Sequence, residues 1–548
     1  MPASFKLSGK GWTRQGGSAA RGQAFSADGR LLRADDLAAL FDRAPDGAAW
    51  AATAGSLNGC FAAVRLQGDV LLAAVDRLRT IPLFFADGAQ APLVADSADA
   101  IAALLPRRDA DFDAREEFRL TGYVTGSGTL IRGIRQIPAG HCLSRGDQSD
   151  AKWTLTPYYA FRHRELRDAS DEMLIDGLIA THESVFRRLL ADVGDRPVIV
   201  PMSGGYDSRL IGVMLRDLGC KNVLCYTYGI AGNWESRISR ELAQHLGFRW
   251  TMVPYSPEAW RGWASTPAFQ AYFRSAGNFA SLPHIQDWPA VHELVRRGEL
   301  DPASVFVPGH SGDFLAGSHI PKWYAGAAAP ITREQLLQSL FDAHYSLWEW
   351  PEQDHGRLRE VFSRRVEEVV GPLADSSAAE AADRFEYWDC QERQAKFIVN
   401  SVRVYESFGF EWRLPLFDHE LMDFWSRVPL NGRIGRRLYF RFANEHQRLP
   451  ITEANTDRPA PITAAIGLAE RLGLRPIGKR AQRAWRRLRR GHIYEHSPMA
   501  WLSIVAPEEF RARYTGREIG HSFFALKYLH DVAAAPAKND RVEDTRGA

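Results

Sequence analysis

The chain has 548 residues, 45% of them hydrophobic and 24% charged, which are the values of a globular protein long enough for two or three domains. A formal net charge of +2 gives no bias toward nucleic acid or any other polyanion. The five scattered cysteines form no C-x-x-C pair, the N-terminus has no apolar signal region and no apolar run reaches 18 residues, so we expect a reduced, cytoplasmic protein without a zinc site.

Residues 1 to about 160 are predicted to form short strands and turns with a few helices. Apolar runs at 57–64 and 70–75 predict an antiparallel hairpin. The second run continues into DRLRTIPLFF (76–85), and further along the chain GYVTGSGTL (122–130) precedes GIRQIPAGH (133–141). Together these segments resemble the glutaminase half of class II asparagine synthetases, which implies an Ntn-type α+β sandwich.

The resemblance fails at the position of the family's nucleophile. In that family a cysteine follows the initiator Met, whereas here Pro2 follows Met1. No cysteine occurs before Cys60, which lies in an apolar strand and is predicted to be a core residue. We therefore expect a degenerate glutaminase-like domain without glutaminase activity. Ammonia or an amine would then come from elsewhere, for instance from a separate glutaminase.

An amphipathic helix within 173–190 leads to the stretch VIVPMSGGYDSR (198–209), which predicts a strand, a tight loop and a helix N-terminus. Gly204 and Gly205 let backbone N–H groups approach an anion, and Ser203 and Ser208 add hydroxyl donors. These features predict a pyrophosphate cradle, with an ordinary strand-to-helix turn as the alternative. The loop lacks the Walker lysine. It resembles the S-G-G-x-D-S loop of the ATP pyrophosphatase superfamily, in which Asp207 would help hold Mg²⁺.

The next strand is predicted at 222–229, beside the first in a parallel sheet covered by helices. Ligands of such sheets bind beyond the carboxyl ends of the strands. The resemblance to the ATP pyrophosphatases therefore places the adenine at Tyr226, Thr227, Tyr228 and Gly229. The alternative is a strand that simply ends at a glycine.

A second strand-to-turn segment reads VFVPGHSGDFLAG (305–317). It resembles the family's G-x-G-x-D-E-x-x-G-G loop, which implies nucleotide contacts at Gly309 and Gly312 and a second Mg²⁺ ligand at Asp313. Mg²⁺ binds proteins through one or two carboxylates plus phosphate oxygens. His310 is the candidate base for an incoming amine because imidazole titrates near neutrality, with a structural histidine as the alternative.

The region beyond residue 348 is predicted to be largely helical. FEWRLPLFDHEL (410–421) resembles the family's E-x-R-x-P-F-L-D-x-x-L run. Arg413 is predicted to pair with Glu411 or Asp418, and Arg393, Lys396 and Arg403 are cations for an anionic ligand or a solvated face. The family's catalytic lysine is missing from the loop at 452–461, so Arg458 is the expected substitute, although a guanidinium cannot transfer a proton as lysine does.

The segment 471–490 is the most basic of the chain. It predicts a helix that binds an anionic lipid surface or a sugar nucleotide, or one that merely exposes a solvated face. Residues 533–548 are predicted to form a disordered tail.

Taken together, these motifs identify the chain as a member of the asparagine synthetase family. The expected fold class is α/β: a degenerate Ntn-type glutaminase-like domain (1–160), then an ATP pyrophosphatase domain (170–532), adenine nucleotide alpha hydrolase-like, with a parallel sheet and added helices. The expected activity is an ATP-dependent, Mg²⁺-dependent amide ligase that forms AMP and pyrophosphate.

The loop variants resemble members from surface-polysaccharide pathways, which implies a uronic acid sugar, free or lipid-linked, as the acceptor. The alternatives are a natural-product enzyme like the β-lactam synthetases or lasso-peptide cyclases, and a non-catalytic nucleotide-binding partner.

Overall fold

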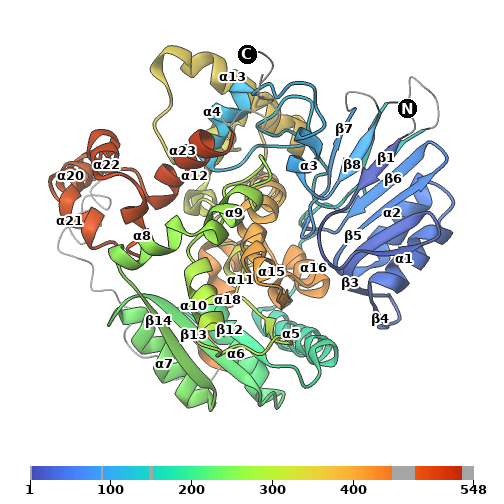
Figure 1. The fold of residues 1–548 in the computed structure, drawn as a ribbon. Coiled ribbons are helices and arrows are strands. Elements are labelled where there is room, and N and C mark those ends of the chain that lie inside the picture. The colour runs from blue at the N-terminus through green and yellow to red at the C-terminus, as the bar shows by residue number, and fades with distance from the viewer. Residues whose placement is uncertain (1–2, 88–90, 147–151, 167, 447–474, 534–548) are drawn as a thin grey trace, which may run out of the picture.

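Three β-sheets with their covering helices make up the computed structural model, which describes residues 3–87, 91–146, 152–166, 168–446 and 475–533 (Figure 1). Two of the sheets come from residues before 160 and lie together at one side of the molecule. The third sheet comes from later residues and lies apart from the first two. The expected loop at 452–461 and all of the expected tail except Ala533 lie outside the described residues.

The larger N-terminal sheet has the order β11-β10-β6-β5-β3-β2, with β4 beside β3, and all of its pairs are antiparallel. The smaller sheet has the order β1-β8-β7-β9, in which only β1 and β8 are parallel. The predicted hairpin is present as β5 (Asn58–Gln67) and β6 (Val70–Val75). The other strands are β1 (Ser4–Lys6), β2 (Thr13–Gln15), β3 (Ser18–Phe25), β4 (Leu31–Leu32), β7 (Phe84–Ala86), β8 (Leu93–Ala95), β9 (Arg135–Gln136), β10 (His141–Arg145) and β11 (Thr154–Pro157).

The two N-terminal sheets pack face to face between layers of helices. Side chains of β5 alternate: Phe61 and Ala63 pack under α1 (Ala34–Arg43) and α2 (Gly47–Ser56), while Ala62 and Val64 face the smaller sheet. The outer face of the smaller sheet packs against α3 (Ala98–Ala102) and α4 (Phe112–Thr121). The layers are therefore helix, sheet, sheet, helix, which is the α+β sandwich that the sequence predicts.

The third sheet is entirely parallel, with the order β14-β13-β12-β15-β16. Its strands are β12 (Val198–Pro201), β13 (Val223–Ile230), β14 (Arg249–Tyr255), β15 (Val305–Phe306) and β16 (Glu411–Trp412), and α5 (Asp171–Val193), α6 (Tyr206–Asp217) and α7 (Trp234–Leu246) connect or flank them. Because all strands run the same way, their carboxyl ends meet at one edge. The loops after β12 and β15 therefore lie side by side at that edge.

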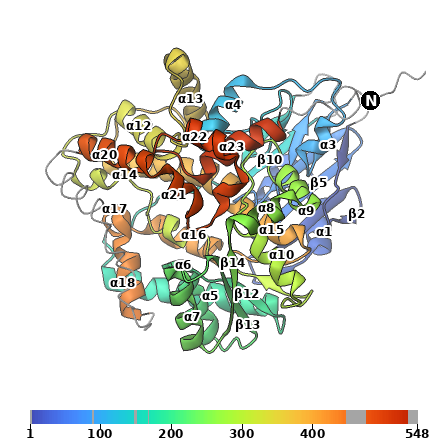
Figure 2. The same cartoon turned by 60° about the vertical axis from the view of Figure 1, so that its left-hand side comes forward.

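The remaining described chain is mostly helical and surrounds the parallel sheet (Figure 2). Helix α14 (Ala378–Asp389) runs directly into η3 (Cys390–Ile398), which is a π-helix. No helix among the described residues combines the length and the apolar character needed to cross a bilayer. The other helices are α8 (Pro257–Ser265), α9 (Pro267–Ser275), α10 (Trp288–Arg296), α11 (Gly312–Leu315), η1 (Lys322–Gly326), α12 (Arg333–His344), η2 (Glu352–Asp354), α13 (His355–Val370), η4 (Val399–Val402), α15 (Arg403–Ser407), η5 (Pro415–Phe417), α16 (His419–Arg427), α17 (Leu430–Arg433), η6 (Ile434–Arg436), α18 (Arg437–His446), α20 (Arg475–Leu488), α21 (Arg490–Glu495), η8 (Trp501–Ile504), α22 (Pro507–Arg513) and α23 (Gly520–Asp531).

The sandwich and the helical part share one apolar core. The N–H of Val124 donates to Ala280 O at 2.9 Å, and the N–H of Leu130 donates to Phe279 O at 2.8 Å. The ring of Phe118 on α4 stacks on Tyr528 of α23, with 5.4 Å between centroids. The two parts are therefore joined through buried backbone bonds as well as through side chains.

Candidate active site

The loop between β12 and α6 is held by its two serines. Ser208 Oγ accepts the N–H of Ser203 at 3.1 Å, and Ser203 Oγ accepts the N–H of Gly205 at 3.1 Å. Ser203 and Gly205 are exposed at the N-terminus of α6. The first turn of a helix and its dipole favour an anion at such a position. The loop thus has the geometry that a phosphate group needs.

Asp207 and Asp313 meet across the sheet edge. The N–H of Asp313 donates to Asp207 Oδ2 at 3.0 Å, and the hydroxyl of Tyr439 donates to Asp207 Oδ1 at 2.6 Å. Burial, followed by the charge of Asp313, raises the pKa of Asp207 to about 7. Ser318 Oγ donates to Asp313 Oδ2 at 2.9 Å. The pair therefore places two carboxylates close together, and this proximity favours binding of a cation.

Two glycines allow the loops of Asp207 and Asp313 to touch. A Cβ on Gly309 would lie 2.7 Å from the backbone nitrogen of Ser208, and a Cβ on Gly312 would lie 2.9 Å from the carboxyl carbon of Asp207. Gly309 and Gly312 are thus required for close approach of the two loops.

The carboxylate pair fits a divalent cation. Two partly buried acids, one of them with its pKa raised toward neutrality, form a site with an excess of negative charge, which Mg²⁺ would offset. No group of three or more His, Cys, Asp or Glu side chains with metal-binding geometry occurs in the described part of the chain. Mg²⁺ commonly uses only one or two carboxylates and completes its shell with phosphate oxygens and water. Asp207 and Asp313 would hold it in this way.

The expected adenine contacts at the end of β13 differ from one another. The side chain of Tyr226 is fully buried, and its hydroxyl donates to Asp287 Oδ1 at 2.9 Å, so it faces the core. Thr227 is buried and Tyr228 is half-buried. Gly229 has a φ of 121°, and a Cβ there would lie 3.2 Å from Pro498 O, because residues near 498 cover this strand end. Of Tyr226, only the backbone remains as a candidate contact.

His310 lies on the same loop as Asp313, and its ring contacts a serine. Its Nε2 lies 2.6 Å from Ser401 Oγ, and burial lowers its pKa to about 4. A histidine with this pKa is a weak proton acceptor at neutral pH. The geometry therefore favours the structural alternative for His310 over the candidate base.

The cations singled out in the sequence have different surroundings. Lys396 is buried, with its ammonium donating to Glu392, and Arg403 pairs with Glu406 at 2.7 Å. Arg413 pairs with Glu411 at 2.8 Å as expected, but its second partner is Asp192 rather than Asp418. Arg393 is half-buried and forms no ion pair or hydrogen bond with any described residue. Arg393 alone of these four remains available to an anionic ligand.

Two further residues of the site went unnoticed in the sequence. Tyr439 binds Asp207, and Arg436 lowers the pKa of Asp207 through its charge. Arg436 has a φ of 60° and follows Gly435, whose φ is 65°, so the chain kinks just before α18. The sequence feature that could have identified Arg436 is the G-R-R run before an apolar helix. The same run is also typical of an ordinary helix start. Arg458 lies outside the described residues.

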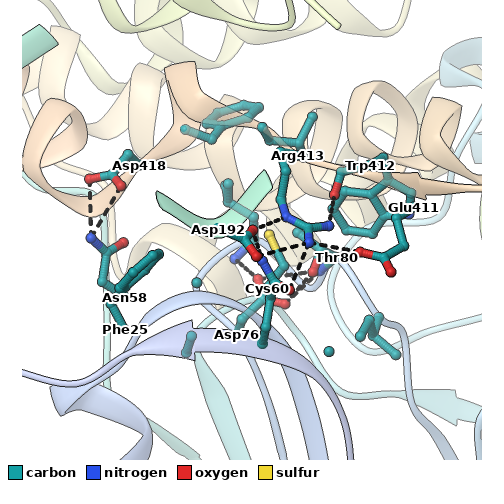
Figure 3. A pocket seen from close by; sticks show the side chains of 18 of the residues that line it. Phe25, Asn58, Cys60, Asp76, Thr80, Asp192, Glu411, Trp412, Arg413 and Asp418 are labelled. Atoms are coloured by element: carbon teal, nitrogen blue, oxygen red, sulfur yellow. Dashed lines mark hydrogen bonds and ion pairs between the residues drawn. The ribbon is translucent and has the colours of Figure 1, made fainter. Parts of the chain in front are cut away.

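A cavity of about 460 Å³ lies between the sandwich and the helical part, and it includes no residue of the 203–208 or 309–313 loops. In Figure 3, Arg413 extends across it toward Asp192 and Glu411, while Asn58 bonds to Asp418. Because these charges are already paired, the cavity is a contact region between the two parts. The carboxylate pair is therefore a better candidate for the active site than this cavity.

Cys60 lines this cavity and is partly buried against the apolar core, so the predicted core residue lies at the edge of the core. Burial and the nearby Asp76 raise its pKa far above the ordinary value. The thiol is therefore protonated and is a poor nucleophile.

Comparison with known proteins gives a domain match. Residues 179–446 match the family model described as asparagine synthase. No curated protein sequence matches the chain. Similar solved structures include a glutamine phosphoribosylpyrophosphate amidotransferase from B. subtilis complexed with ADP and GMP, at 12% identity over 44% of this chain and 72% of that chain, with a TM-score of 0.19. Another, described as the allosteric regulatory enzyme of purine biosynthesis, has 13% identity over 54% of this chain and 70% of that chain, also with a TM-score of 0.19. TM-scores this low carry no weight for the fold, which rests on the sheets described above.

The matched residues contain all five strands of the parallel sheet together with Asp207, Asp313, Arg436 and Tyr439. Residues 179–446 are thus similar to an asparagine synthase domain, the domain type of ATP-dependent amide ligases.

Proposed function

We propose that this protein activates a sugar carboxylate with ATP, releasing pyrophosphate, and converts it to an amide with ammonia or an amine. The observation that carries the proposal is the partly buried pair of Asp207, in the first turn of α6, and Asp313 of the neighbouring loop. A carboxylate oxygen of the acceptor would attack the α-phosphorus of ATP. Pyrophosphate would leave, and the nitrogen would then displace AMP from the acyl-adenylate.

The residues of the site have separable tasks in this reaction. The N-terminus of α6 would hold phosphate oxygens, and Arg436 would lie against the departing pyrophosphate. Mg²⁺ held by Asp207 and Asp313 would supply charge neutralisation on the phosphates. Positioning and electrostatics of this kind account for most of the catalysis in phosphorus chemistry.

For the acceptor we propose a uronic acid sugar of surface-polysaccharide biosynthesis. Arg393 supports an anionic acceptor, because it is the cation of the neighbouring helix without a partner among the described residues. A guanidinium binds a carboxylate or a phosphate in a bidentate manner. The β-lactam synthetase-like and lasso-peptide cyclase-like alternatives predict turnover with an amino-acid-derived carboxylate instead.

The nitrogen is proposed to come from free ammonia, an amine or a separate glutaminase. The sandwich contains two cysteines, Cys60 and Cys142. Burial raises the pKa of both thiols, that of Cys142 to about 12. Neither thiol is poised for attack on glutamine.

The test is pyrophosphate release from Mg-ATP with ammonium and a panel of carboxylates that includes glucuronic acid, UDP-glucuronic acid and amino acids. Release with the uronic acids alone supports the proposal. Asp313→Asn should abolish release because the cation loses a ligand. Asp217→Asn, at the exposed far end of α6, is the matched control and should retain it. Nucleotide binding without turnover on any carboxylate would favour the non-catalytic reading.

We also propose that a basic surface on α20 and α21 contacts an anionic membrane at the cytoplasmic face. The surface consists of Arg486, Arg487, Arg489 and Arg490 around Leu488, whose side chain is 86% exposed. These four arginines form no ion pair with any described residue. Cations around an exposed apolar side chain suit the headgroup region of an anionic bilayer. This location would bring the site to a lipid-linked acceptor.

Vesicle flotation tests the membrane contact. The protein should float with vesicles containing phosphatidylglycerol and stay behind with pure phosphatidylcholine. Leu488→Asp should abolish flotation, whereas Leu104→Asp, an exposed leucine of the sandwich, should not. Equal recovery of the two variants would contradict the membrane contact.

A further inference from the structure

A buried carboxylate holds a partly exposed histidine at the edge of the candidate site. His319 Nδ1 lies 2.5 Å from Asp389 Oδ2. Asp389, the last residue of α14, is fully buried, whereas the side chain of His319 is 26% exposed. No described residue forms a hydrogen bond with His319 Nε2. One ring nitrogen is thus anchored while the other is open to a ligand.

His319 belongs to the loop that carries Asp313. The neighbouring Ser318 donates to Asp313 from its hydroxyl at 2.9 Å and from its N–H at 3.0 Å. At the other end of the loop, Ser311, whose φ is 68°, donates to Gln394 Oε1 at 2.7 Å. Gln394 in turn donates to Asp389 Oδ1 at 3.1 Å. Both ends of the loop are therefore fixed to the start of the π-helix, an element that often marks functional sites.

The charged groups around His319 favour its protonated form. Burial works against the charge, yet Asp389 and the more distant Asp313 raise the pKa of His319 above its ordinary value, while Arg393 opposes them. Burial likewise works against the Asp389 carboxylate, but His319 and His344 hold the pKa of Asp389 well below its usual range. The negative charges of Asp389 and Asp313 therefore stabilise an imidazolium formed at His319.

We propose that His319, oriented by Asp389, accepts the proton of the attacking amine at the adenylation site. The step rests on the proposed function. The nitrogen lone pair forms the C–N bond to the acyl carbon, the bond from that carbon to the AMP oxygen breaks, and AMP leaves with the electron pair. One N–H proton passes to His319 Nε2, and solvent later removes it. Asp389 is a positioning residue that fixes the ring and stabilises the imidazolium.

The other histidines near the site are less suited to this task. His310 has its Nε2 against Ser401 and a pKa lowered to about 4. His344 lies 3.9 Å from Asp389, but it is buried, and burial lowers its pKa to about 4. Among these three, His319 alone combines an open nitrogen with a raised pKa.

The first arm of the test needs no substrate. Histidine side chains labelled with ¹⁵N should show His319 carrying its proton on Nδ1 when neutral and titrating above the ordinary imidazole range. In Asp389→Asn its pKa should fall. Titration of His319 at or below the ordinary value, or no change in Asp389→Asn, overturns the proposal.

The second arm separates the two half-reactions with UDP-glucuronic acid as the probe carboxylate. His319→Gln should retain exchange of pyrophosphate into ATP but lose amide formation by about 10²- to 10⁴-fold, the usual contribution of a general base. Its pH profile for amide formation should lose the acidic limb that we expect for the wild type. Hydroxylamine, a less basic nucleophile, should restore part of the rate.

The matched control for this arm is His245→Gln, at the exposed end of α7, which should behave as wild type. Wild-type amide formation by His319→Gln refutes the role of His319. Absence of exchange in the wild type refutes the proposed function itself.

Discussion

Replacing Gly312 by alanine tests whether contact between the two loops sets the position of Asp207. The backbone of Gly312 is not in the left-handed region, so alanine is compatible with its conformation and the perturbation is purely steric. The new Cβ would lie 2.9 Å from Cγ and Oδ1 of Asp207 and 3.1 Å from Leu416 Cδ1. The carboxylate lies between these loops and must therefore move.

The size of the effect follows from the distances. Ordinary contacts with a Cβ begin at 3.4 Å, so the carboxylate must withdraw by about half an ångström or more. This movement strains the bonds from Asp313 N–H and the Tyr439 hydroxyl, and a hydrogen bond to a charged group contributes about 1.5–3 kcal/mol. We expect affinity for the magnesium complex of a non-hydrolysable ATP analogue to fall by about 10- to 100-fold.

Isothermal titration calorimetry of the magnesium–analogue complex provides the measurement. Gly356→Ala is the matched control, because a Cβ there meets nothing within 4 Å and its φ is not positive. This control should bind as the wild type does. Unchanged binding by Gly312→Ala, with an unaltered thermal transition, would show that Asp207 is not positioned by this contact.

Other residues give independent tests. Arg436→Gln should weaken binding of the same analogue by about 10-fold, because the site loses a cation that would lie beside the phosphates. Arg216→Gln, at the far end of α6, is the control and should bind as the wild type does. Equal affinities of the two variants would exclude Arg436 from the site. Arg413→Met leaves the buried Asp192 with fewer partners, so the free energy of unfolding measured in urea titrations should fall by about 2–3 kcal/mol. Arg427→Met removes a surface ion pair and should lower the free energy of unfolding by less than about 1 kcal/mol. Burial lowers the pKa of His182 to about 4, so its contribution to stability is complete above pH 6.5 and lost as the pH falls toward 4, by up to about 3 kcal/mol. His182→Gln should therefore show a shallower loss of stability than the wild type over that window, and parallel curves would contradict this account.

Local patterns in the sequence were sufficient to predict the strand and the helix that form the site. The apolar run before Ser203 and the helical period after it predict β12 and α6, because both depend on residues adjacent in the chain. The same holds for the hairpin of β5 and β6. These elements form wherever alternation or helical periodicity buries one face.

Contacts between distant segments escaped the sequence. His319 and Asp389 are 70 positions apart, and Tyr439 and Asp207 are 232 apart, so no local pattern links them. His310 was chosen for its residue type, but its protonation is set by burial, which follows from tertiary packing. Gly312 was predicted to bind nucleotide, whereas its visible role is to make room for a carboxylate of another loop.

The shared core has a consequence for how the chain can be shortened. A fragment that begins near residue 170 would uncover Phe279, Ala280 and Tyr528, and the ammonium of Lys396 would lose the carbonyl oxygens of Val124 and Gly126. The C-terminal part therefore needs the sandwich to cover its apolar residues and to accept the buried ammonium group. Selection acting on amide synthesis alone would preserve the sandwich over generations, whether or not the sandwich still performs chemistry of its own.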